Sequence, residues 1–499
     1  MIWGPCMISP HLCAAMFAYL QVRAPENLAF GGGAEETTIH PLVAVYLLLV
    51  IALVMFLPRR WAIAPFLFAF FTIPVGQVVV LGPFHFTALR ILILASLARL
   101  AFTRRLPSDR FGGMDWAVVL WSISAAICAC LEWRLQTGEL VRQAGGLLDT
   151  LGGFLAVRFL IPDSETMRRT FKTLAAICAV FAMTMVIEQV KHVNVFGLLG
   201  GVPTEVAVRN GQLRSGATLG YLYAGAFAGV LIPLFVWLWT KKSRFAACVG
   251  FVGATVMVIT SHSSTSLLAL AGSFVGLAFW PLRNRMRIIR WGLVCTLVAL
   301  HMVMKAPVWS LIQRIDLTGS SSGSQRYLLV DMTIRHFTEW WLIGTKAYID
   351  WGWGTWDLCN QFVAVALTGG LLTLIFYVMI FKRGFSSIGT ARKLVMGDGE
   401  QEWLFWCLGA SLFATVVAHF GINYMAQLIV SFFVLVVCII VATFEVTQSA
   451  EQPATASAAP QELLTPIPAV SSLALRKVQT ETKHAAFKPK RQSPIRSKA

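Results

Sequence analysis

The chain has 499 residues, of which 57% are hydrophobic and only 13% are charged. Soluble domains carry about 25% charged residues because their surfaces must be solvated, so this composition excludes a water-soluble protein and predicts a surface that faces lipid. The formal net charge of +17 would suit a nucleic-acid-binding protein, but the Lys and Arg residues lie in short clusters between apolar runs, which argues against nucleic acid as a partner.

The apolar runs predict the fold class. A helix of about 20 apolar residues crosses the hydrocarbon layer, and lipid cannot satisfy the backbone hydrogen bonds of any open, irregular chain. We therefore expect an all-α, polytopic transmembrane helix bundle of about 12–14 spans over residues 41–446. The predicted spans are 41–57, 61–82, 84–102, 114–131, 144–161, 171–190, 217–240, 245–261, 264–281, 288–305, 360–381, 402–421 and 424–445. The N-terminal segment, 1–40, contains one further marginal helix candidate at 6–22.

The positive charges predict how the bundle is oriented. Every second connection between the predicted spans carries Lys or Arg, as in Arg59–Arg60 and Lys241–Lys242, and cytoplasmic loops retain these residues. The opposite side then holds two larger extracytoplasmic loops, near 191–216 and 306–359. Residues 447–499 are rich in Ala, Pro, Ser and Thr and end in a basic stretch, which predicts a disordered cytoplasmic tail.

The first outer loop carries two candidate anion ligands, Arg209 and Arg214, directly before a Gly-rich span. The guanidinium group presents a fork of donors suited to phosphate oxygens, so a pyrophosphate-bearing lipid is a reasonable ligand. The alternative is that both arginines are solvated or contact lipid headgroups.

The second outer loop contains Arg326, Tyr327, Arg335 and His336 within a stretch that has helical spacing. Its predicted apolar stripe consists of Tyr327, Val330, Ile334 and Phe337, which would place this helix at the membrane surface. Arg326 and Arg335 are candidate anion ligands, although Arg335 would equally suit an i, i+4 ion pair with Asp331 or Glu339.

Asp357, Asn360 and Gln361 precede the next span at helical spacings of i, i+3 and i+4. On one helix face, a carboxylate and two amides would orient or deprotonate a sugar hydroxyl. A further polar group, residues 260–266, includes Ser261 and His262 at the turn between two spans. Substrate contact and helix capping are both open there. The sequence has no P-loop, GxGxxG or HExxH motif, so neither a cofactor nor a metal ion is predicted.

These features together resemble the superfamily of O-antigen ligases and Wzy-type polymerases, which assemble glycans of the bacterial envelope. The resemblance covers residues 40–445. It rests on an arginine loop before a Gly-rich span (Arg214 to Gly229), a Ser/Thr-rich turn (Ser261 to Ser266), Ser-x-x-x-Arg-Tyr from Ser322 to Tyr327, and a Trp-Gly-x-Gly stretch that ends in a polar pair before Gly369–Gly370.

The resemblance implies a metal-independent, GT-C-like glycosyl transfer in the bacterial inner membrane. The donor would be an undecaprenyl-diphosphate-linked glycan, and the acceptor another glycan or a lipid. Arg214 and Arg326 would grip the diphosphate, with Arg209 and Arg335 as further candidates. Gln361, Ser261, His262 and Tyr327 would contact substrate. Cys359–Asn360 stands where ligases of the family carry His-Asn, so Asp357 or His336 would supply the base beside Asn360.

Two other functions are compatible with the composition: a transporter of a lipid-linked glycan or other solute, and a non-catalytic scaffold of a polysaccharide export complex. Transporters place ionisable residues near the bilayer midplane, often in two matching halves, whereas this chain gathers its polar residues at one side and has no evident internal repeat. Membrane lipids are partners in every case. The sequence does not separate polymerase from ligase.

Overall fold

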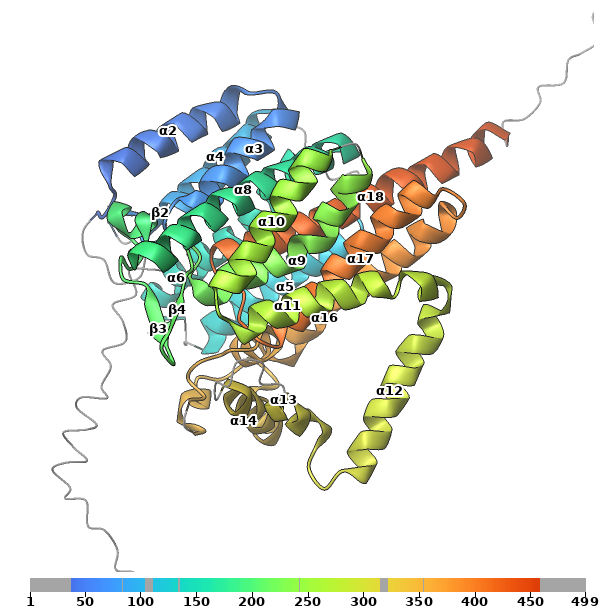
Figure 1. Cartoon of the computed structure of the whole chain (residues 1–499). Coiled ribbons are helices and arrows are strands. Elements are labelled where there is room, and N and C mark those ends of the chain that lie inside the picture. The colour runs from blue at the N-terminus through green and yellow to red at the C-terminus, as the bar shows by residue number, and fades with distance from the viewer. Residues whose placement is uncertain are drawn as a thin grey trace, which may run out of the picture. The chain divides into compact units, whose positions relative to one another are not determined.

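The computed structural model describes residues 37–82, 84–103, 111–132, 135–241, 243–314, 322–352 and 354–457. Its elements are almost all helical, which confirms the all-α fold class (Figure 1). The marginal helix candidate at 6–22 lies outside the described residues. The chain divides into two units, with the boundary between residues 449 and 450.

Seven described helices are long and apolar enough to cross a membrane, which supports a multi-pass membrane protein. They are α5 (Gly113–Glu132), α8 (Ser164–Lys191), α9 (Tyr221–Thr240), α12 (Met286–Val303, preceded by the 3-10 turn η5, Trp280–Arg285), α16 (Gln361–Leu394), α17 (Gly399–His419) and α18 (Gln427–Ser457). The shorter apolar helices are α2 (Pro41–Phe56), α10 (Arg244–Thr260) and α11 (Ser264–Ala278).

Three more helical segments complete the bundle: α3 (Arg59–Thr72), α4 (Ala88–Thr103), and the run formed by α6 (Thr137–Leu147), a π-helical turn η3 (Leu148–Gly152) and α7 (Gly153–Leu160). Each predicted span therefore coincides with a helix. Several of these helices are shorter than a full crossing, so the count of 12–14 spans stays a prediction.

Local chemistry explains where the helices begin. The Asp163 side chain accepts from Thr166 N at the start of α8, and Asp398 accepts from Glu400 N and Gln401 N at the start of α17. Pro41 occupies the first turn of α2, where its missing N–H costs nothing. These caps satisfy backbone donors that have no partner inside the helix.

Small residues let the central helices pack closely. Helix α10 packs against α8 and α9, α11 packs between α9 and α17, and α16 packs against α5 and α17. A Cβ at Gly253 would lie 2.9 Å from the backbone of Cys178, and one at Gly229 would lie 2.9 Å from Leu270 N. Close helix contacts of this kind replace the hydrophobic effect as a driving force inside a bilayer.

The predicted spans 61–82 and 84–102 are wrong at their facing ends. Helix α3 stops at Thr72, and an antiparallel hairpin of β1 (Val78–Leu81) and β2 (Phe84–Thr87) precedes α4. Pro74 cannot donate to a continuing helix, and the run Val78–Val80 favours a strand.

Among their described residues, the two long connections contain no helix long and apolar enough to span a membrane, as predicted. The first holds the 3-10 turn η4 (Val195–Leu199) and a hairpin of β3 (Ala207–Arg209) and β4 (Gln212–Arg214). The second holds the short elements η6 (Val308–Ser310), α13 (Leu311–Arg314), α14 (Ser322–Arg335), α15 (Phe337–Trp340) and η7 (Ala347–Asp350). Both lie at one end of the bundle, here called the α14 end (Figure 1).

Helix α12 stands apart from the other helices, and none of its residues is buried (Figure 1). Its apolar side chains are therefore open to lipid on every side. At the other end of the chain, α18 continues to Ser457, beyond residue 447 where the disordered tail was predicted to begin. The rest of that predicted tail, 458–499, lies outside the described residues.

Candidate functional site

A tight hairpin presents the first pair of candidate arginines. Asn210 and Gly211 both have positive φ angles, 53° and 74°, as a two-residue type I′ turn requires. Arg209 ends strand β3, which is exposed throughout, and it does not line the neighbouring cavity. Arg214 ends strand β4 and is only 6% exposed. The hairpin thus separates an exposed arginine from a buried one.

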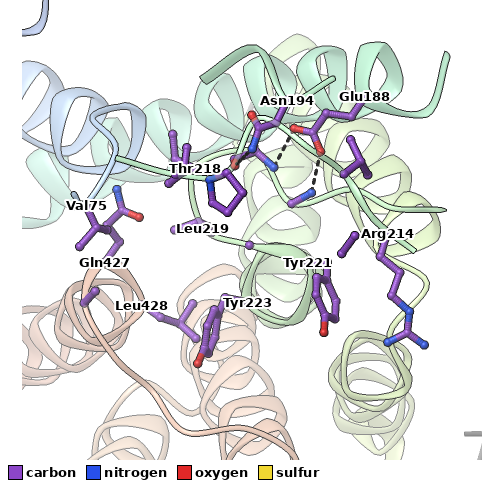
Figure 2. Close-up of a pocket in the computed structure, with 18 of the residues that line it drawn as sticks. Val75, Glu188, Asn194, Arg214, Thr218, Leu219, Tyr221, Tyr223, Gln427 and Leu428 are labelled. Carbon is purple, nitrogen blue, oxygen red and sulfur yellow. Dashed lines mark hydrogen bonds between the residues drawn. The ribbon is translucent and has the colours of Figure 1, made fainter. Parts of the chain in front are cut away.

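Arg214 lies at a cavity of about 300 Å³, which is also lined by Tyr221, Tyr223 and Gln427 (Figure 2). Its guanidinium carbon lies 5.4 Å from the centre of the Tyr221 ring, and its Nε is buried without a hydrogen-bond partner among the described residues. No carboxylate in the described part of the chain lies within ion-pair distance of it. A buried cation without an acidic partner is costly, so this site favours an anionic ligand.

The segment that carries Arg214 is held by polar side chains from outside the hairpin. The Glu188 carboxyl group accepts from Gly216 N at 2.8 Å and from Ala217 N at 3.0 Å (Figure 2). Asn194 Nδ2 donates to Ala217 O at 2.8 Å. Gln189 Nε2 donates to Leu213 O, Ser215 Oγ and Thr260 O. The backbone around Arg214 is therefore fixed before any ligand arrives.

The Ser/Thr-rich turn lies against this segment, because Ser215 N donates to Thr260 O at 3.1 Å. Ser261 Oγ is buried and donates to Val258 O, and it also contacts Ser266 Oγ at 3.0 Å. This hydroxyl is thus used within the turn. His262 has a positive φ of 44°, and its buried Nδ1 has no hydrogen-bond partner in the described part of the chain.

Helix α14 carries the second buried arginine, Arg326, which is 7% exposed. One terminal nitrogen of its guanidinium donates to Thr265 Oγ1 at 2.9 Å and to Gly421 O at 3.3 Å. Thr265 belongs to α11 and Gly421 to the connection between α17 and α18. Arg326 therefore joins the outer helix to the mouth of the bundle.

The buried face of α14 differs from the predicted stripe. Arg326, Leu329 and Thr333 are buried on one face, whereas Ile334 and Phe337 are exposed and Tyr327 and Val330 are half-buried. Helix α14 points a charged residue inward, because Arg326 has polar partners in the bundle that an apolar count does not reveal. Contact of the apolar stripe with a membrane surface stays a prediction.

Asp357 lies beside Arg326 in the connection before α16. Gln325 Nε2 donates to Asp357 Oδ2 at 3.4 Å and to Gly354 O at 3.1 Å. The carboxyl group is open to solvent on one side, yet desolvation by the surrounding protein raises its pKa, while the Gln325 hydrogen bond and the Arg326 charge act in the opposite direction. A carboxylate with a raised pKa is a stronger base.

The predicted helical face of Asp357, Asn360 and Gln361 is wrong. Helix α16 begins at Gln361, and Asn360 is its N-cap, with the amide oxygen accepting from Phe362 N and Val363 N. Gln361 Oε1 accepts from Tyr424 N at 2.6 Å. Asp357 therefore lies in a loop, because the N-cap chemistry of Asn360 starts the helix only after it.

The remaining candidates, Arg335 and His336, each pair with an acidic side chain of their own segment. Arg335 Nε donates to Asp331 Oδ2 at 2.7 Å, which is the i, i+4 ion pair that the sequence allowed. His336 Nδ1 lies 2.6 Å from Glu339 Oε1, and the His336 ring stacks on Trp351 with ring centres 4.5 Å apart. The hydrogen bond from His336 lowers the pKa of Glu339.

Cys359 is half-buried directly before Asn360, the N-cap residue of α16. Burial is the main cause that raises the pKa of its thiol to about 11, and the neighbouring Asp357 charge adds to the shift. The thiol therefore stays protonated near neutral pH. Among the described residues, no cluster of three or more His, Cys, Asp or Glu side chains is arranged to hold a metal ion.

The structure thus brings together Arg214, Arg326 and Asp357 around the turn 260–266, with Tyr223 near enough to Asp357 for electrostatic interaction. Arg209 stays apart from the cavity. The sequence analysis missed Glu188 and Gln189, which hold the Arg214 segment. The available signal was an adjacent carboxyl and amide side chain at the end of the long apolar run in the second half of α8.

In comparisons with known proteins, no protein-family model matches this sequence, and neither does any curated protein.

Proposed function

We propose that this protein is a membrane glycosyltransferase that moves a glycan from a lipid-diphosphate carrier, of the undecaprenyl type, to an acceptor hydroxyl. The observation that carries the proposal is the burial of Arg214 at a cavity without a carboxylate partner among the described residues. A second buried arginine, Arg326, and a carboxyl group, Asp357, lie at the same end of the bundle.

The chemistry follows from these groups. Asp357 would take the proton from the acceptor hydroxyl, the acceptor oxygen would attack the anomeric carbon, and the bond from that carbon to the diphosphate oxygen would break. The diphosphate would leave with the bonding electrons. Arg214 and Arg326 would stabilise it, because fixed cations at a developing negative charge lower the barrier of transfer. His336 remains the alternative base.

The orientation of the protein is part of the proposal. Two basic connections lie near the start of α17, where Lys241 pairs with Glu400 and Arg283 of η5 pairs with Glu402, whereas Arg326 of α14 contacts Gly421 beyond the other end of α17. Since cytoplasmic loops retain positive charge, this arrangement supports a cytoplasmic C-terminus and a candidate site on the outer side of the bacterial inner membrane. Lipid-linked glycans would then be extended or transferred outside the cell's cytoplasm.

The test is glycan chain length and linkage in envelope extracts of cells with wild-type protein, a deletion, Arg214→Ala or Arg326→Ala, at equal membrane levels. Arg285→Ala, an exposed arginine in η5, is the matched control. The deletion and both site variants should accumulate single lipid-linked repeats or unattached polymer, while the control should resemble wild type. Unchanged glycans in the deletion would refute the proposal and favour a transporter or scaffold.

A further inference from the structure

Glu188 lies beside the Arg214 cavity but is not its ion-pair partner. The carboxyl group is buried, with 1% of the residue exposed, and it lines the same cavity as the buried guanidinium. Two opposite charges that share a small buried space would ordinarily pair. Here they do not, because both Glu188 oxygens accept from backbone N–H groups of Gly216 and Ala217, and the Arg214 side chain runs away from Glu188 (Figure 2).

The consequence is that Arg214 keeps its charge for a ligand. We infer that Glu188 is a positioning residue for the anion site: it fixes segment 213–217 through the two backbone amides and so holds Arg214 at the cavity, unpaired, for a diphosphate. The inference rests on the proposed function for the identity of the ligand. It goes beyond that function by naming Glu188 as the residue that keeps the anion-binding Arg214 in place.

Two neighbouring contacts support this role. Asn194 Nδ2 donates to Ala217 O, so Ala217, whose N–H donates to Glu188, is also held through its carbonyl group. Gln189, the next residue of α8, holds Leu213 O on the other side of Arg214. Three side chains thus fix one short segment, and only one of them is acidic.

The competing explanation is that Glu188 acts through its charge, as a distant counter-ion that weakens anion binding. Length and charge can be separated by substitution. Glu188→Asp keeps the charge, but its shorter side chain cannot reach the amides at 2.8 and 3.0 Å without a shift. Glu188→Gln keeps the length and one acceptor oxygen but loses the charge. Asn194→Ala changes no charge and removes the second support, together with the N-cap hydrogen bond that Asn194 Oδ1 accepts from Phe196 N.

The experiment measures binding of inorganic pyrophosphate to the purified full chain in phosphatidylcholine nanodiscs, by calorimetry, with thermal unfolding as the check on folding. Positioning predicts that Glu188→Asp weakens binding about 5-fold, that Asn194→Ala also weakens it, and that Glu188→Gln has an effect of about 2-fold, the range expected for single hydrogen bonds. Glu165→Asp is the matched control, since Glu165 lies on the same helix in an exposed ion pair with Arg169.

A double-mutant cycle separates positioning of Arg214 from a general structural role. In an Arg214→Ala background, Glu188→Asp should change pyrophosphate binding by less than about 2-fold, because the group that it positions is gone. The inference is overturned if Glu188→Asp binds like wild type, if Glu188→Gln binds more tightly than wild type, or if the effect of Glu188→Asp persists without Arg214.

Pyrophosphate binding and the glycans of the deletion strain together distinguish failure of this inference from failure of the proposed function. Pyrophosphate binding that depends on both Arg214 and Glu188, together with unchanged glycans in the deletion strain, would uphold the positioning role and reject the transferase. No pyrophosphate binding by the wild type would reject the inference directly.

Discussion

Gly370 interrupts α16 in a conformation that no other residue type readily adopts. Its φ and ψ angles are 73° and −177°, and the chain after α15 fits into the break, where Leu371 N donates to Trp341 O and Thr345 N donates to Leu367 O, both at 2.8 Å. A Cβ at Gly370 would lie 2.5 Å from Leu342 O. The variant Gly370→Ala therefore meets both backbone strain and a collision with backbone.

The expected cost is about 1–3 kcal/mol for the backbone conformation and about 1–3 kcal/mol for the overlap, so roughly 2–6 kcal/mol in all. Thermal unfolding of the protein in nanodiscs should show an apparent Tm lower by about 5 °C or more. Gly389→Ala is the matched control, since Gly389 lies in the same helix and a Cβ there meets nothing within 4 Å. Equal melting of the two variants would refute the reasoning.

Three further outcomes are expected. Asp115→Ala should destabilise the protein by about 3–5 kcal/mol, because it leaves the buried Arg158 without the carboxylate with which it forms an ion pair. The double variant Asp115→Ala/Arg158→Met should melt at a higher temperature than Asp115→Ala, and a lower Tm for the double variant would contradict this reasoning. Arg335→Ala should cost less than about 1 kcal/mol, since its pair with Asp331 is exposed on the arginine side, and a large loss of stability would argue for a buried role. The rate of glycan transfer should rise with pH as Asp357 ionises. Gln325→Leu should move that rise to higher pH, because it removes a hydrogen bond that lowers the pKa of Asp357. Initial rates measured across pH would show no shift, or a shift to lower pH, if Asp357 is not the base.

The helices were predictable because a membrane span requires a long apolar run, and such runs are visible in the sequence alone. The hairpins were not predicted, although one had a clear signal. Asn210–Gly211 is the preferred sequence of a two-residue hairpin turn, and Pro74 marks the end of α3. Counting apolar residues in long windows hides such short elements, because four strand residues extend a helical run without lowering its hydropathy.

The candidate site was predictable in its cations and less so in its supports. Arg214 and Arg326 stood out because they lie beside spans on the side that the charge pattern predicts to be outside, and a charge near the bilayer needs a partner. Glu188 meets amides 28 and 29 residues along the chain, and Arg326 meets a carbonyl 95 residues away. Contacts of that separation depend on how the helices pack. Asn360 was misplaced for a local reason, since an asparagine before an apolar run is also an N-cap signal.

The most direct test of the central claim uses the purified protein in nanodiscs with a synthetic undecaprenyl-diphosphate-linked glycan and an acceptor glycan. The measurement is the amount of undecaprenyl diphosphate released for each glycosidic bond formed. The account predicts equal amounts of the two products from the wild type and a loss of both in Arg214→Ala. Bond formation in Arg214→Ala at the wild-type rate, or neither product from the wild type, would contradict it.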